Sequence, residues 1–130
     1  MIYSEQEKRR MEHILEAFHD YISNHSFFDL VYSDKIGYFR VQVEYPDEEG
    51  LVVIRSVDKL LDVLFNEIIN DILYAEDGGR HDNTELLQEE AAEARRRITT
   101  ILEALDDGAD YCLDFLDAYL ENYPYNSVED

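Results

Sequence analysis

Residues 28–45, FDLVYSDKIGYFRVQVEY, decide the fold class because their apolar residues recur at every second position. This period is typical of half-buried strands, whose side chains point alternately to opposite faces. Segments 33–37 and 46–50 have turn composition, and residues 51–55 supply a third β-branched run. The pattern predicts a three-stranded antiparallel β-meander with one wet face, lined by Arg40, Gln42 and Glu44.

Helical spacing flanks this segment on both sides. Apolar residues at intervals of three and four predict a helix from Ser4 to about Asn24 and another from its N-cap Ser56 to about Ala75. A third helix follows the loop 76–83, and after a break at 106–108 a fourth runs to about Asn122, before Pro124. We expect one α+β domain over residues 1–130: an N-terminal helix, the three-stranded antiparallel meander, then three helices packed on one face of the sheet, with a short polar tail at 124–130.

Charge is the most informative property of the composition. The 130 residues include 31 acidic and 11 basic ones, which gives a formal net charge of −20. Contact with nucleic acid or anionic membranes relies on Lys and Arg, so we expect neither as a direct partner and favour a basic protein. The start of the chain lacks the pattern of a secretory signal, and no apolar run approaches the length of a membrane span, which predicts a cytoplasmic protein. The single Cys112 lies among apolar residues and is expected to be a buried thiol.

The last predicted helix carries acidic residues spaced three, four, three and four apart. At about 100° per residue they fall within an arc of roughly 80°, opposite Cys112, Leu116, Tyr119 and Tyr123. The helical rise places neighbouring carboxylates about 4.5 to 6 Å apart along the axis, a spacing that permits phosphate mimicry. We call this set the acid row: Asp107, Asp110, Asp114, Asp117 and Glu121.

Like charges at these intervals destabilise a helix by a few tenths of a kcal/mol per pair. After Arg97 the sequence contains no Lys or Arg, so relief within the helix is absent, although the arginines at 95–97 could reach it by tertiary contact. The simpler alternative is an ordinary solvated face. Tyr111 and Phe115 lie beside the row and are candidate anchors for a partner, or they pack against the first or third predicted helix. A second acidic group at the hairpin tip, best explained as a solvated turn, comprises Glu44, Asp47, Glu48 and Glu49.

Two patterns resemble enzyme sites. His19-Asp20 and His81-Asp82 are similar to the paired metal ligands of HD-type phosphohydrolases, but further ligands of that family are missing. An arrangement similar to the magnesium-binding acidic pairs of all-α nucleotide pyrophosphohydrolases, with a shorter separation, comprises Glu90, Glu93, Glu103 and Asp106. We predict no catalytic centre, cofactor or metal, and keep a magnesium-dependent nucleotide pyrophosphohydrolase as the enzyme alternative.

In size, charge and the character of its last helix, the chain resembles the DNA-mimic inhibitors of mobile elements, including anti-CRISPR and anti-restriction proteins. The resemblance implies an inhibitor or antagonist that occupies the basic groove of a nucleic-acid-binding protein. An immunity protein against a nuclease toxin is the alternative with the same mechanism. The residues expected to bind the partner are Asp107, Asp110, Tyr111, Asp114, Phe115, Asp117 and Glu121.

Overall fold

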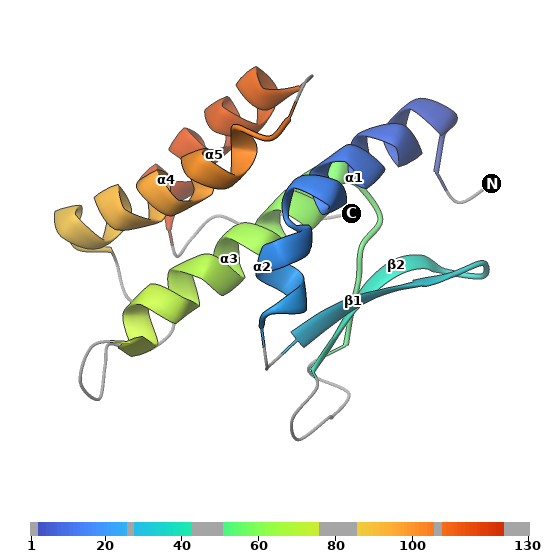
Figure 1. The fold of residues 1–130 in the computed structure, drawn as a ribbon, viewed down its shortest axis with the longest axis horizontal. Coiled ribbons are helices and arrows are strands. Elements are labelled where there is room, and N and C mark those ends of the chain that lie inside the picture. The colour runs from blue at the N-terminus through green and yellow to red at the C-terminus, as the bar shows by residue number, and fades with distance from the viewer. Residues whose placement is uncertain (1–2, 26–27, 43–50, 76–85, 106–107, 124–130) are drawn as a thin grey trace. The chain divides into compact units, whose positions relative to one another are not determined.

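The computed structural model describes residues 3–25, 28–42, 51–75, 86–105 and 108–123, and its elements follow the predicted order (Figure 1). The strands form one antiparallel sheet in the order β1-β2-β3. The predicted α+β sequence of helix, three-stranded antiparallel sheet and three further helices is confirmed. The elements are α1 (Glu5–Ala17), α2 (His19–Ser23), β1 (Phe28–Ser33), β2 (Gly37–Gln42), β3 (Val52–Val53), α3 (Val57–Ala75), α4 (Gln88–Leu102) and α5 (Ala109–Asn122).

Residue contacts divide the chain into two compact units, a first unit up to Leu60 and a second unit from Leu61. In the first unit, Ser4 caps α1, since its Oγ accepts a hydrogen bond from the Glu7 amide at 3.1 Å. The predicted helix over 4–24 is interrupted at Phe18, whose φ of −90° and ψ of 3° leave the helical region. The Phe18 ring is fully buried, so α1 and α2 meet at a core residue.

Tyr3 fastens the N-terminal segment to the sheet. Its hydroxyl donates to the Ile54 carbonyl at 2.5 Å and accepts from the Tyr38 amide at 2.8 Å, and its ring stacks on the Tyr38 ring with centroids 6.1 Å apart. Gly37 makes this approach possible, because a Cβ there would lie 2.3 Å from the Tyr3 hydroxyl oxygen. Gly37 also has a φ of +80°, a conformation that favours glycine. One residue therefore serves both the hairpin turn and the contact with Tyr3.

The prediction that Arg40 and Gln42 lie on a separate polar face of the sheet is wrong, because they pair with Leu30 and Phe28. The register pairs Leu30 with Arg40, so these two side chains share a face with Phe28. The Arg40 guanidinium lies 5.6 Å from the centre of the Phe28 ring, which is itself buried. The turn between β1 and β2 sets this register, and a shift of one residue would exchange the faces of a whole strand.

In the second unit the helices bury the stripes that the sequence predicts. The first turn of α3 still belongs to the first unit, where Ser56 caps the helix as expected, with its Oγ accepting from the Lys59 amide at 3.1 Å. α4 and α5 pack together, and α3 contacts α5 through Phe65. The buried apolar residues of these helices include Leu64, Phe65, Ile68, Ile69, Ala94, Ile98, Leu102, Cys112 and Leu116.

Gly37→Ala should lower the free energy of unfolding by about 3 kcal/mol, because the new methyl group would displace Tyr3 in addition to straining the backbone. The matched control is Gly108→Ala. Gly108 has a similar φ of +85°, but among the described residues no atom beyond its chain neighbours lies within 4 Å of the position that a Cβ would take, so the expected loss is about 1 kcal/mol. Urea denaturation of both variants measures the difference, and equal losses would contradict the role assigned to Tyr3.

Candidate functional site

The orientation of α5 about its axis is fixed by contacts with α3. The rings of Phe115 and Tyr119 lie 6.0 and 5.9 Å from the ring of Phe65. The Tyr119 hydroxyl donates to the Asp62 carboxylate at 2.7 Å, which adds a directional contact to the apolar ones. Cys112, Leu116, Tyr119 and Tyr123 are all buried, so the predicted packed side of this helix is confirmed.

The acid row lies on the opposite, exposed side of α5. Asp110, Asp114, Asp117 and Glu121 are all exposed. Asp107 lies outside the described residues. The fixed packing of α5 thus presents four carboxylates at helical intervals to solvent, which is the arrangement that the sequence predicts.

One carboxylate of the row is paired within the second unit. Arg95 Nε lies 2.8 Å from Asp117 Oδ1, and about half of each side chain is exposed. The hydrogen bond to Asp117 raises the pKa of Arg95 above its ordinary value. The tertiary relief that the sequence left open therefore exists at Asp117. An exposed pair of this kind contributes roughly 0.2 to 1 kcal/mol, so it restrains Asp117 only weakly.

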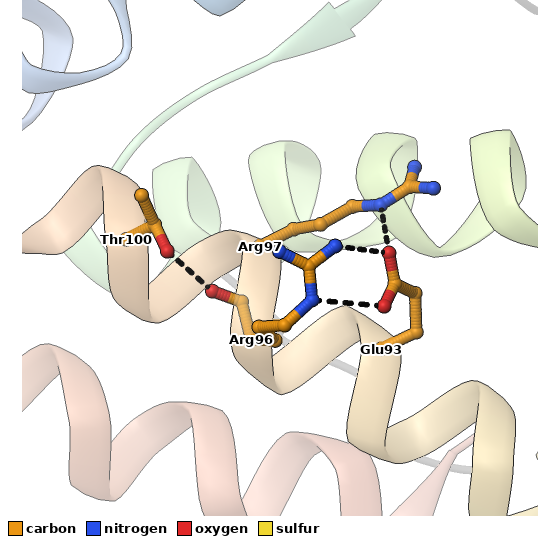
Figure 2. A network of polar contacts seen from close by, with 4 residues as sticks. All are labelled: Glu93, Arg96, Arg97 and Thr100. Atoms are coloured by element: carbon orange, nitrogen blue, oxygen red, sulfur yellow. Dashed lines mark hydrogen bonds and ion pairs between the residues drawn. The ribbon is translucent and has the colours of Figure 1, made fainter.

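The other two arginines of α4 are bound to Glu93 (Figure 2). Arg96 contacts both carboxylate oxygens, at 2.6 and 3.0 Å, and Arg97 Nε contacts Oε1 at 2.8 Å. The hydrogen bonds from Arg96 and Arg97 lower the pKa of Glu93 to about 2. These spacings of three and four residues keep both guanidinium groups on their own helix.

Three members of the row form no ion pair in the part of the chain that the structure describes. Within residues 3–25, 28–42, 51–75, 86–105 and 108–123, no ion pair involves Asp110, Asp114 or Glu121. These three side chains form the core of the candidate site. The three arginines of α4, the helix that packs against α5, are bound to Asp117 and Glu93.

The two predicted aromatic anchors differ in their surroundings. Tyr111 is 46% exposed and lies directly after Asp110. Phe115 is half-buried and contacts the rings of Phe65 and Tyr119, so it packs against α3, the second predicted helix, and not against the first or third as the simpler alternative had it. Tyr111 is the better candidate for contact with a partner.

The residues that suggested a magnesium site have other roles where the structure describes them. Glu90 is 8% exposed and accepts a hydrogen bond from the Leu87 amide at 2.8 Å, which stabilises the start of α4. Glu93 is bound by two arginines, and Glu103 is exposed. Asp106 lies outside the described residues.

Only one of the two HD-like pairs lies within the described residues. His19 and Asp20 are exposed neighbours at the start of α2, with Nδ1 and Oδ1 3.5 Å apart. His81 and Asp82 lie outside the described residues, as does the acidic hairpin tip at 44–49. Among the described residues, no three His, Cys, Asp or Glu side chains are grouped to hold a metal ion.

Negative charge is concentrated in the half of the sequence that contains α5. Residues 61–130 contain 19 of the 31 acidic residues and 4 of the 11 basic ones. The row therefore lies in a strongly negative part of the chain, where the potentials of separate carboxylates add.

Comparisons with known proteins leave the site to be interpreted from its chemistry. Scans against protein-family models, curated proteins and solved structures found no match to this chain. None of the helices in the described ranges has the length and apolar character needed to cross a bilayer.

A pH titration tests whether Glu93 holds the arginines. Because the folded-state pKa of about 2 lies below the ordinary 4.5, the stabilisation from this carboxylate is complete above about pH 4.5 and is lost as the pH falls through 2. We expect the Glu93 carboxyl carbon to titrate near 2 by NMR, and to titrate closer to 4.5 in the Arg96→Gln/Arg97→Gln variant. A value near 4.5 in the unmodified protein would show that the arginines are free.

Proposed function

We propose that this protein is an acidic inhibitor whose α5 surface occupies the basic groove of a nucleic-acid-binding protein. The observation that supports this proposal is the exposure of Asp110, Asp114 and Glu121 on a helix whose orientation is fixed, with no ion pair among the described residues. The proposed action is stoichiometric binding and requires no catalytic residue, cofactor or metal.

The spacing of the row suits a groove that binds phosphates. Neighbouring carboxylates rise about 4.5 to 6 Å along the helix axis. Successive phosphates of one strand of duplex DNA rise about 3.4 Å along its axis, which is of the same order. Lys and Arg side chains that meet a row of phosphates are long enough to adjust to this difference. A groove built for a nucleic-acid strand could therefore accept α5.

The cost of the row to the protein also supports an external role. Carboxylates three and four residues apart repel one another, and Glu121 lies near the helix C-terminus, where the macrodipole disfavours negative charge. Arg95 relieves this repulsion at Asp117 alone among the described members of the row. Binding to a cationic groove would remove the repulsion along the whole row.

Long-range attraction would assist the encounter. The net charge of −20 and its concentration after residue 60 create a field that accelerates approach to a basic surface. Such binding weakens as salt rises, because the exposed charges are screened. The same physics would serve an immunity protein that covers the active site of a nuclease toxin, and the identity of the partner distinguishes these two forms of inhibitor.

Affinity capture at low salt tests the proposal. The immobilised protein is exposed to a nuclease-treated lysate of its native cell, and bound proteins are eluted with duplex DNA. We expect nucleic-acid-binding proteins or nucleases to be retained and to be displaced by DNA. In the variant Asp110→Asn/Asp114→Asn/Glu121→Gln, retention should fall by about tenfold or more, since the row loses its charge.

The matched control is Glu5→Gln/Glu16→Gln/Glu103→Gln, which removes the same number of exposed carboxylates elsewhere. Equal loss of retention in both triple variants would contradict the assignment to α5 and would indicate a general charge effect. The variant Arg95→Gln makes the acid row more negative, because Asp117 loses its ion pair with Arg95. This variant should retain the same proteins to a higher salt concentration. Weaker retention would contradict the proposal that the acid row binds the partner.

A further inference from the structure

Arg95 differs from the other two arginines of α4 in having no acidic residue at helical spacing on its own helix. The positions three and four residues before and after it hold alanine, isoleucine and threonine. Arg96 and Arg97 both find Glu93 at such a spacing and pair with it. The guanidinium of Arg95 instead reaches the neighbouring α5, where it pairs with Asp117. The sequence of α4 thus directs one of its three arginines to the acid row.

This contact places a positive charge within the acid row. Asp117 lies three residues after Asp114 and four before Glu121, so the three carboxylates share one side of α5. Arg95 Nε donates to Asp117 Oδ1 at 2.8 Å. The Arg95 and Asp117 side chains are 51% and 53% exposed, so the guanidinium is accessible at the surface that the row forms. A partner that lies along the row would meet this charge.

The guanidinium of Arg95 opposes a cationic partner for as long as it stays on Asp117. Positive groups of a basic groove that pair with Asp114 and Glu121 would lie on either side of it. The helical rise places these two carboxylates about 4.5 and 6 Å from Asp117 along the axis. Such distances are shorter than the Debye length of about 8 Å at physiological salt, so the repulsion is screened only in part.

The ion pair is weak enough for a partner to open. Arg95 contacts Asp117 through Nε alone, whereas the stronger pairs of arginine with a carboxylate use two parallel hydrogen bonds. Both side chains keep about half of their exposure, so both ions remain largely hydrated and lose little when they separate. A groove that supplies cations of its own can therefore replace Arg95 at Asp117.

We propose that Arg95 is an autoinhibitory contact of the acid row, which leaves Asp117 when a cationic groove binds along α5. This inference rests on the proposed inhibitor function and adds a regulation of the same site. Arg95 holds the place that a positive group of the partner takes in the complex. The contact raises the density of positive charge that a partner needs, because a weakly basic surface does not displace it.

NMR of the full chain, titrated with hexalysine at about 0.05 M salt, tests the displacement. Hexalysine supplies a series of cations and has no guanidinium signal that would overlap with that of Arg95. We expect it to shift the backbone amides of α5 around Asp114 and Glu121. The Arg95 Nε–Hε resonance should move towards its position in the Asp117→Asn variant. Shifts of the α5 amides with an unchanged Arg95 resonance would overturn the proposal.

The affinity for hexalysine tests whether Arg95 opposes binding. Arg95→Gln should bind about two- to fivefold more tightly, since the competing cation is gone, and Arg95→Lys should bind as the unmodified chain does. The matched control Arg97→Gln makes the same change in net charge but removes an arginine that is bound to Glu93. Its affinity should change by less than about 1.5-fold, because its charge lies away from the row. Equal gains in Arg95→Gln and Arg97→Gln would contradict the inference.

Failure of this inference is distinguishable from failure of the inhibitor proposal. Absence of hexalysine binding to α5, in the unmodified chain and in Arg95→Gln alike, would overturn the autoinhibitory role. The inhibitor proposal fails instead if no nucleic-acid-binding protein or nuclease is captured from the lysate, a result that does not involve hexalysine. Capture through α5 with Arg95 still on Asp117 would leave the inhibitor proposal standing and remove the autoinhibitory contact.

Discussion

The contact between α5 and α3 is the constraint on which the candidate site depends. Phe65 packs against two rings of α5, and the hydroxyl of Tyr119 donates to Asp62. Apolar packing alone would bury one side of the helix, but the directional hydrogen bond also restricts its rotation. Because the carboxylates follow the same helical period as the buried residues, this single orientation exposes Asp110 and the rest of the described row together.

The three consecutive arginines of α4 determine how much of that charge remains. Successive residues of a helix point in directions about 100° apart, so one run of arginines is divided between two partners. Arg95 reaches Asp117, while Arg96 and Arg97 stay with Glu93 on their own helix. Glu93 therefore holds two of the three guanidinium groups on their own helix, and only Arg95 pairs with α5. The negative surface results from this division as much as from the acidic residues themselves.

The sequence predicted those features of the fold that depend on the spacing of residues close together in the chain. The order of elements, the Ser56 cap and the two sides of α5 follow from intervals of two, three and four residues, and the structure confirms them. The register of the hairpin was beyond this approach, because each strand shows its own alternation but not which residues pair across the turn. The prediction for Arg40 failed for that reason. The contact between Arg95 and Asp117 joins residues 22 positions apart, and the packing of Phe115 on Phe65 likewise depends on tertiary structure.

The electrostatic potential along α5 provides the most direct test of the central claim, that the row presents uncompensated negative charge to other molecules. It can be measured by NMR from the relaxation of backbone amides in the presence of small cationic and anionic nitroxide probes. The account predicts that the cationic probe is enriched several-fold over the anionic one near Asp110, Asp114 and Glu121, and less so near Asp117, where Arg95 lies. Equal effects of the two probes along α5 would contradict it.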